Sequence, residues 1–267
     1  MPAIDKYNSR VDKVNSLLCV GLDPDFEKLP ERFKKLEHPQ FEFNKWIIDQ
    51  TVELVSAFKP NMGAYEARGG AGWRDLQMTM DYLRRNFPDV FTISDAKRGD
   101  IGYTNELYAR AILDELGFDA VTLHPYLGQE ALEPFLSRAD KGCIILCRTS
   151  NPGASELQDL EFNGQKLWQI VAGRVSKDWN KNQNCMLVVG ATYPMELAEV
   201  RKITGDMTFL VPGIGTQGGS VSQVMKAGLN SSGKGLVINS SKGIIFSSNP
   251  KAEAKKLRDE INQYRNV

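Results

Sequence analysis

The chain has 267 residues, of which 42% are hydrophobic, and its 33 lysine and arginine residues balance 33 aspartate and glutamate residues. A net charge of zero argues against a protein that binds nucleic acid or an anionic membrane through a broad basic face. The apolar runs are far shorter than the roughly 20 residues that cross a bilayer, and charged residues stand near the N-terminus, where a signal peptide would be apolar. We therefore predict a cytoplasmic protein without a nucleic-acid or membrane partner.

Short β-branched runs alternate along the chain with segments whose apolar residues repeat at helical spacing, which is typical of consecutive βα units in a parallel sheet. The predicted strands are Leu17–Leu22, Ser56–Pro60, Val90–Asp95, Ala120–His124, Cys143–Cys147, Met186–Gly190, Thr208–Val211 and Leu236–Asn239. No linker rich in Pro, Gly or Ser separates two halves, and no short internal repeat is present. The sequence favours one α/β domain over residues 1–267, and a barrel of about 250 residues is an architecture of matching size.

Cysteine and histidine usage narrows the kinds of site that the chain can build. The four cysteines, Cys19, Cys143, Cys147 and Cys185, lie inside hydrophobic runs, which predicts buried free thiols. Because the chain contains only two histidines, it can assemble neither a zinc site of Cys/His spacing nor a centre of several histidines.

Polar residues collect where the predicted strands end. They are Asp23 after the first strand, Lys59 in the second, Asp95 ending the third, His124 ending the fourth and Arg148–Asn151 after the fifth. Barrel enzymes carry their chemistry on the loops that follow the carboxyl ends of the strands, so these positions predict an active site at that rim. The longest irregular stretch, residues 149–163, also follows the fifth strand, and loops of that length are more often functional than idle.

Asp95, Lys97 and Asp100 form the densest group of charges at this rim. Side chains alternate along a strand, so Asp95 and Lys97 are expected to face the same way, and Gly99 lets the chain turn and bring Asp100 close. Taken alone, this string is better explained by exposed ion pairs, which are common at strand ends and contribute little to stability. The addition of Lys59 from the second strand favours a site.

The chemistry of such a group is that of a proton donor. A lysine flanked by carboxylates stays protonated, so Lys97 is a poor Schiff-base nucleophile but a usable general acid for a developing carbanion. The neighbouring aspartates would repel a substrate carboxylate and tolerate its loss as carbon dioxide. The pattern therefore indicates decarboxylation without a cofactor.

A glycine-rich segment, Gly213–Gly219, follows the seventh predicted strand and contains G-x-G-x-x-G. A dinucleotide site also needs an acidic residue about 20 positions later, and residues 207–252 contain neither Asp nor Glu. Gly228–Gly235 resembles a P-loop but has Gly235 where Ser or Thr would bind magnesium, so it is interpreted as the turn before the eighth strand. The remaining interpretation is a barrel phosphate site, with Lys242 after the eighth strand as its cation; a flexible loop with a solvated lysine is the alternative.

Several blocks of sequence, taken together, resemble the orotidine 5'-phosphate decarboxylase family in its longer bacterial form. The blocks are Leu22–Asp25, Lys59–Asn61, Asp95–Thr104, His124–Gly128, Arg148–Gly153 and Val211–Gly219. They occur in the family's order at the ends of the predicted strands, and the resemblance runs from about Leu17 to Lys242. It implies a (β/α)8 TIM barrel that acts as a homodimer and converts orotidine 5'-monophosphate to uridine 5'-monophosphate, in pyrimidine biosynthesis, without metal or cofactor.

The resemblance also implies roles for individual residues. Lys97 resembles the lysine that protonates C6 of the pyrimidine, Asp95 the aspartate that faces the departing carboxylate, and Lys59 the lysine that orients this array and contacts the ribose. Asp100 resembles the aspartate that reaches into the partner's site, accompanied by Ile101 and Thr104. Asp23 resembles a ribose-binding aspartate, Ser150 the residue that recognises the pyrimidine edge, and Gln217, beside Gly218, the glutamine that closes over phosphate and base. Lys242 departs from the pattern, because the family usually has arginine there, and lysine lacks the bidentate fork.

Two other functions stay open at this point. One is a magnesium-dependent sugar-phosphate decarboxylase or aldolase of the same barrel suprafamily, such as a keto-gulonate phosphate decarboxylase or a hexulose phosphate synthase, which would use the acidic residues as metal ligands. The segments Asp100–Asn105 and Arg148–Gly153 suit a nucleotide better. The other is a barrel that binds a nucleotide phosphate without catalysis, for which Lys59, Asp95, Lys97 and Asp100 have no evident use. His124 is assigned no role in proton transfer.

Overall fold

The computed structural model describes residues 1–214 and 218–265. Within them, eight parallel strands close into a barrel in the order β1-β10-β9-β8-β5-β4-β3-β2. The strands are β1 Leu18–Leu22, β2 Ala57–Pro60, β3 Phe91–Arg98, β4 Ala120–Leu123, β5 Gly142–Arg148, β8 Cys185–Val189, β9 Phe209–Pro212 and β10 Leu236–Ser240. Each predicted strand is present, and β3, which runs to Arg98 rather than Asp95, differs most from its predicted bounds. The predicted (β/α)8 fold is confirmed.

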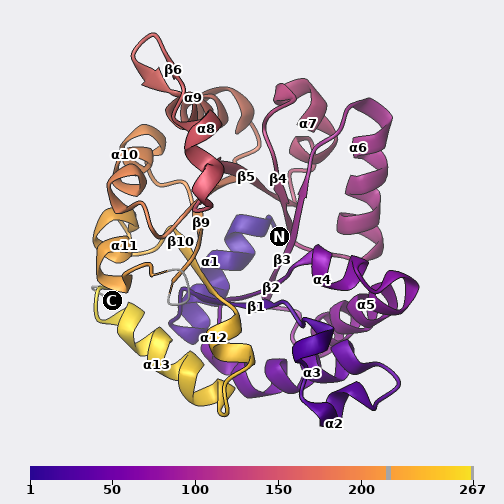
Figure 1. Cartoon of the computed structure of the whole chain (residues 1–267). Coiled ribbons are helices and arrows are strands. Elements are labelled where there is room, and N and C mark those ends of the chain that lie inside the picture. The colour runs from indigo at the N-terminus through magenta and orange to yellow at the C-terminus, as the bar shows by residue number, and fades with distance from the viewer. Residues whose placement is uncertain (215–217, 266–267) are drawn as a thin grey trace.

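Helices surround the barrel, as Figure 1 shows in a view into the ring of strands. The α-helices are α1 Ala3–Val14, α2 Glu31–Lys34, α3 Pro39–Thr51, α4 Met62–Glu66, α5 Gly69–Asn86, α6 Gly102–Ala109, α7 Gly128–Leu136, α8 Ser155–Gln158, α9 Leu167–Arg174, α10 Pro194–Thr204, α11 Val221–Gly228, α12 Lys242–Ile245 and α13 Pro250–Asn262. Short 3₁₀ segments are η1 Phe26–Lys28, η2 Val52–Leu54 and η4 Pro152–Ala154, and π-helical turns η3 Arg110–Glu115 and η5 Val175–Trp179 extend α6 and α9. The strands are thus covered on both faces, which explains their nearly continuous apolar runs.

Helix α1 covers the amino ends of the strands. Its Tyr7 hydroxyl donates to the carbonyl of Leu236 at the start of β10, and the Tyr7 ring packs edge-on against Phe91 at the start of β3. Arg10 donates to the carbonyl of Val55, just before β2, and Lys6 pairs with Asp119, just before β4. Helix α1 thus occupies the end of the barrel opposite the carboxyl rim, where the sequence predicts the active site.

The barrel core is apolar and contains all four cysteines. Cys19, Cys143, Cys147 and Cys185 are buried and free, as predicted. Burial raises the pKa of the Cys147 and Cys185 thiols to about 12, so both stay protonated at neutral pH. They are packing residues rather than nucleophiles.

The segment 149–163, expected to be irregular, contains ordered structure. It includes η4, α8 and the first strand of a small antiparallel hairpin, β6 Glu161–Phe162 and β7 Gln165–Lys166. Asn163 and Gly164 make the turn with φ angles of 51° and 76°, which favour this residue pair. The helical turn is only four residues long, too short to give a periodic signal in the sequence. No helix among residues 1–214 and 218–265 is both long and apolar enough to span a membrane.

Candidate active site

A cavity of about 1070 Å³ opens at the carboxyl ends of the strands. Leu146, Val188 and Leu210 give it an apolar lining, and polar side chains from neighbouring strand ends complete it. The residues predicted from the sequence that line this cavity are Asp23, Lys59, Asp95, Lys97, His124, Ser150, Gly213 and Lys242. The closed barrel therefore brings together polar strand ends that lie far apart in the sequence, at the rim where they were predicted.

Asp95 is the centre of the charged residues. Its Oδ2 accepts a hydrogen bond from Lys59 Nζ at 2.8 Å, and its Oδ1 accepts one from Lys97 Nζ at 2.5 Å. Thr122 Oγ1 donates to Oδ1 at 3.1 Å, and Asn61 Nδ2 lies 3.4 Å from Oδ2. Both carboxylate oxygens are thus engaged, each with an ammonium group.

The side chains of Lys59 and Lys97 differ strongly in how far they are buried. The Lys59 and Asp95 side chains are 4% and 11% exposed, whereas the Lys97 side chain is 50% exposed. Burial alone would lower the pKa of Lys59, but the charges of Asp95 and Asp23 outweigh it and raise that pKa. Burial alone would raise the pKa of Asp95, but Lys59 and Lys97 hold it well below its usual range. Lys59 is therefore a fixed buried cation at the cavity wall, whereas Lys97 is half exposed there.

Lys97 has a left-handed backbone, with a φ of 48°, which non-glycine residues rarely adopt. Its amide donates to Thr122 Oγ1 at 2.9 Å, the same hydroxyl that donates to Asp95. The register of β3 against β4 shifts between Ser94 and Arg98, as at a β-bulge. Lys97 and Asp95 meet as the sequence predicted, but through this irregularity instead of regular strand alternation.

The loop after β3 is held by His124. The His124 Nε2 atom lies 2.9 Å from the carbonyl oxygen of Gly99, and a Cβ at Gly99 would lie only 2.4 Å from the imidazole. Close approach to the His124 ring thus requires glycine at this position. Asp100 does not line the cavity of its own chain; its Oδ1 accepts from the amide of Ile101 at 2.7 Å, and its own amide donates to Asn105.

The glycine-rich segment lies across the cavity from this loop. Gly213 lines the cavity with a φ of 105°, and Gly218 has a φ of 83°, conformations that glycine tolerates. The amide of Gly219 donates to the carbonyl of Gly213 at 3.2 Å, which closes the base of the loop. Gly215 and the predicted phosphate residue Gln217 lie outside the described residues.

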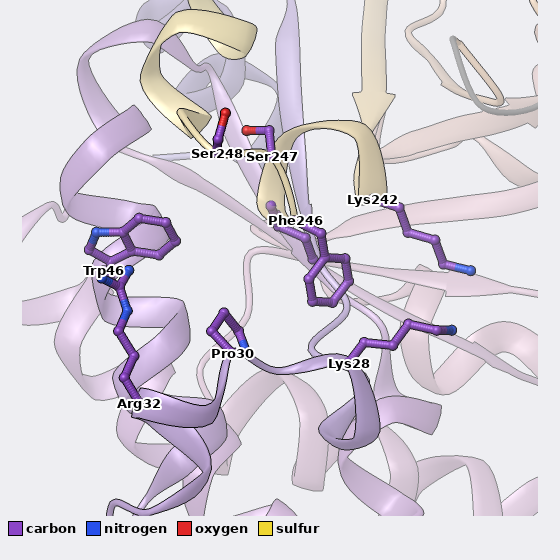
Figure 2. Close-up of a pocket in the computed structure, with 9 residues that line it drawn as sticks. Lys28, Pro30, Arg32, Trp46, Lys242, Phe246, Ser247 and Ser248 are labelled. Atoms are coloured by element: carbon purple, nitrogen blue, oxygen red, sulfur yellow. The ribbon is translucent and has the colours of Figure 1, made fainter.

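Lys242 begins α12 and lines both the main cavity and a neighbouring cavity of about 640 Å³. Figure 2 shows this neighbouring cavity, with the side chains of Lys242 and Lys28 extending in the same direction. Lys28 pairs with Asp25 at 2.8 Å, whereas the Lys242 ammonium makes neither a hydrogen bond nor an ion pair with any residue in 1–214 or 218–265. Lys242 is therefore available to an anionic ligand.

Residues 16–257 match the sequence profile of the Orotidine 5'-phosphate decarboxylase / HUMPS family. The chain belongs to this family. It is 49% identical to the orotidine 5'-phosphate decarboxylase of Flavobacterium johnsoniae over 96% of this chain and 93% of that protein. It is 45% identical to the Cellvibrio japonicus protein of the same name over 98% of each. The solved structure of Leishmania donovani OMP decarboxylase covers 100% of both chains with a TM-score of 0.90 and 39% sequence identity.

Membership in this decarboxylase family confirms the resemblance drawn from the sequence blocks. Most of the predicted residues share one cavity, but Asp100, Ile101, Thr104 and Gly218 are not among those lining it in a single chain. Thr122 was missed, because a lone threonine inside a strand gives no signal of its contact with Asp95. Asn61 was present in a family-like block, but its approach to Asp95 required the pairing of neighbouring strands.

Proposed function

We propose that this chain decarboxylates orotidine 5'-monophosphate to uridine 5'-monophosphate. The observation that carries the proposal is the Lys59–Asp95–Lys97 array at the wall of a cavity large enough for a nucleotide, in a chain of the decarboxylase family. A ligand in the cavity meets the ionised Asp95 beside the exposed ammonium of Lys97. That pairing suits a reaction in which a carboxylate leaves and a proton takes its place.

In the proposed mechanism, Lys97 is the proton donor. The bond between C6 and the carboxyl carbon breaks, the carboxyl group departs as carbon dioxide, and the electron pair remains at C6. The Lys97 ammonium gives its proton to C6, and the neutral amine recovers a proton from solvent. Asp95 faces the departing carboxylate, and Lys59 fixes Asp95 and contacts the ribose. Stabilisation of the developing charge by a preorganised ammonium is the main contribution we assign to the protein.

The reaction is proposed to need neither metal nor cofactor. Support comes from the partners of Asp95, since ammonium groups engage both of its oxygens. A divalent cation at Asp95 would have to displace an ammonium group. Lys59 is buried and has no other ion-pair partner among residues 1–214 and 218–265, and leaving such a cation unpaired is costly. The lysines therefore supply the positive charge that a magnesium-dependent relative would take from its metal.

Substrate binding is assigned to the rest of the rim. Asp23 is proposed to bind the ribose and Ser150 the pyrimidine edge, both from positions on the cavity wall. Gln217, Gly218 and Lys242 are proposed to hold the phosphate. Because the phosphate is remote from the reacting carbon, its binding energy can be used to close the site around the transition state.

We propose that the working unit is a homodimer with shared sites. Asp100, with Ile101 and Thr104, would enter the cavity of the partner chain. Support comes from large apolar side chains left exposed next to Asp100 in the chain: Ile101 is 63% and Tyr103 73% exposed, and a second copy would cover such side chains. Mixing Asp100→Ala with Lys97→Ala protein should restore part of the activity that each lacks. No recovery after confirmed subunit exchange would contradict the shared site.

The deciding experiment is the ultraviolet absorbance of orotidine 5'-monophosphate with purified protein, with and without EDTA. Conversion that EDTA leaves unchanged is the expected result. Loss of activity in EDTA, or turnover only of a sugar phosphate with magnesium, would favour the magnesium-dependent alternative. Binding of the nucleotide without turnover would favour the non-catalytic alternative.

We further infer that residues 1–267 form one catalytic domain. Its support is that residues near both termini contact the same strand region: Tyr7 donates to the start of β10, and Arg265 donates at 3.2 Å to the carbonyl of Gly233, just before β10. A cytoplasmic location stays a prediction from the sequence.

A further inference from the structure

The turn that carries Asp23 has its carbonyl groups fixed by buried side chains of two outer helices. Tyr65 of α4 donates its hydroxyl to the carbonyl of Leu22 at 2.9 Å, and Gln40 of α3 donates Nε2 to the carbonyl of Pro24 at 2.8 Å. The carbonyl of Asp23 itself accepts from the amide of Asp25 at 2.9 Å. The carbonyl groups of Leu22, Asp23 and Pro24 are thus all hydrogen-bonded. The backbone is therefore held on both sides of Asp23, whose carboxylate lines the cavity.

The Gln40 amide can lie in only one orientation. Its Oε1 accepts from Arg68 Nη1 at 3.1 Å, so Nε2 must be the atom that donates to Pro24 and, at 2.9 Å, to the carbonyl of Ala64. Asp75 fixes the assembly from behind, since its Oδ2 accepts from Arg68 at 2.9 Å and from the amide of Gln40 at 3.1 Å. Gln40 and Asp75 are fully buried, at 0% and 1% exposed, so these bonds do not compete with water.

The Tyr65 side chain is also fixed in one orientation by its hydrogen bonds. It is fully buried, and its hydroxyl accepts from Asn44 Nδ2 at 2.9 Å while donating to Leu22. Burial raises the pKa of the Tyr65 phenol well above its ordinary value, so the hydroxyl keeps the proton that it donates. The ring and its hydrogen-bond partners leave this carbonyl little freedom.

The Asp23 side chain makes no hydrogen bond within residues 1–214 and 218–265, although the charge of Lys59 acts on it. Its Oδ1 is buried and has no hydrogen-bond partner among residues 1–214 and 218–265. A buried carboxylate oxygen without a donor is costly unless a ligand supplies one. The position of this carboxylate is therefore determined by its backbone, and the backbone is held by Tyr65 and Gln40.

We propose that Tyr65 and Gln40 are positioning residues that hold Asp23 ready for a hydroxyl of the ligand's sugar. The inference rests on the proposed function, because it assigns Asp23 to the ribose. Neither side chain lines the cavity, so both act through the Asp23 turn. Their loss is expected to weaken nucleotide binding without contact to the nucleotide.

The test is a double-mutant cycle read by calorimetric titration with uridine 5'-monophosphate. Tyr65→Phe and Gln40→Met are each measured with Asp23 intact and in an Asp23→Ala background. With Asp23 intact, each should weaken binding about tenfold, as expected when a contact group loses its alignment. In the Asp23→Ala background the same changes should alter affinity less than about twofold. Thr51→Val is the matched control, because it removes a buried hydroxyl of α3 whose one partner in the described part of the chain is the carbonyl of Ile47; it should leave affinity unchanged.

Equal losses of affinity in both backgrounds would show a general structural role and overturn the proposal. Unchanged affinity in a folded Tyr65→Phe protein, or in Asp23→Ala itself, would also overturn it. Thermal unfolding of every variant identifies those that fold. If Gln40→Met does not fold, Tyr65→Phe alone carries the test, because it removes only one oxygen atom. Turnover of orotidine 5'-monophosphate by the unmodified chain is measured separately, since its absence would contradict the proposed function rather than the role of these two residues.

Discussion

The two sides of the cavity mouth are built in different ways. On the side of β2 to β4, the charged side chains are bound to one another and to polar side chains at neighbouring strand ends, and Asp95 alone has four side-chain neighbours within hydrogen-bonding reach. On the side of β9 and β10, the groups facing the cavity include glycine backbone and Lys242, which has no side-chain partner in the described part of the chain. On the first side the charged groups already have their hydrogen-bond and ion-pair partners without a ligand. On the second side the groups that face the cavity are left for a ligand to bind.

This difference suggests that residues on the first side mainly stabilise the transition state and that residues on the second side mainly bind the ligand. A charged group that must stabilise a transition state gains most when it is already oriented, because no reorganisation is needed during the reaction. A group that binds a remote phosphate can instead be ordered by that phosphate and use the energy for closure. Changes on the first side should therefore lower turnover, and changes on the second should mainly weaken binding.

The largest effect is expected for Lys97→Ala. Removal of the proposed proton donor should lower kcat by about 10²- to 10⁴-fold, while calorimetry should find the affinity for uridine 5'-monophosphate little changed. Lys255→Ala is the control, because it also removes an exposed lysine paired with an aspartate, at 2.7 Å, but on α13. Undiminished turnover in Lys97→Ala would remove this residue from the mechanism.

A smaller effect is expected at the phosphate side. Lys242→Ala should lower kcat/KM by roughly 10- to 100-fold, the value of one hydrogen bond to a charged group, and should raise KM more than it lowers kcat. Lys242→Arg should lower KM, because the guanidinium can bind phosphate through two parallel hydrogen bonds. Steady-state kinetics across these variants, with Lys28→Ala as the neighbouring control, checks the assignment. An unchanged KM in Lys242→Ala would contradict it.

The smallest effect concerns pH. The pKa of Asp95 is lowered in the folded chain, so its ionisation stabilises the fold above the unfolded pKa of about 4, and this contribution is lost as pH falls toward the folded value. The difference in free energy of unfolding between the parent and Asp95→Asn should therefore be constant from about pH 8 to pH 5 and shrink below about pH 4. Urea unfolding at several pH values measures it. A difference that already changes between pH 6 and 8 would mean that Asp95 titrates there.

Much of the fold could be predicted because a strand covered on both faces leaves a nearly continuous apolar run. β1 and β8 show this directly, as every residue in them is buried. The four-residue helix α8 and the cover that α1 provides could not be predicted. A helix this short carries no period, and α1 reaches its position through contacts such as that between Tyr7 and Leu236, which lie at opposite ends of the sequence.

The candidate site was predictable where chemistry is carried by charged residues at strand ends, as with Asp95 and Lys97. It was not predictable where neutral residues act through distant contacts. Thr122, Tyr65 and Gln40 resemble ordinary strand and helix residues until the barrel closes, and each then bonds a group more than fifteen residues away along the chain.

The left-handed backbone of Lys97 sets stability against activity at a single position. A non-glycine residue pays roughly 1–2 kcal/mol for this conformation, and the half-exposed ion pair of Lys97 returns little of that. Glycine would adopt the same φ without the steric cost. A screen that selects only for heat resistance should therefore favour Lys97→Gly, and the selected protein would be more stable but would lack the proposed proton donor.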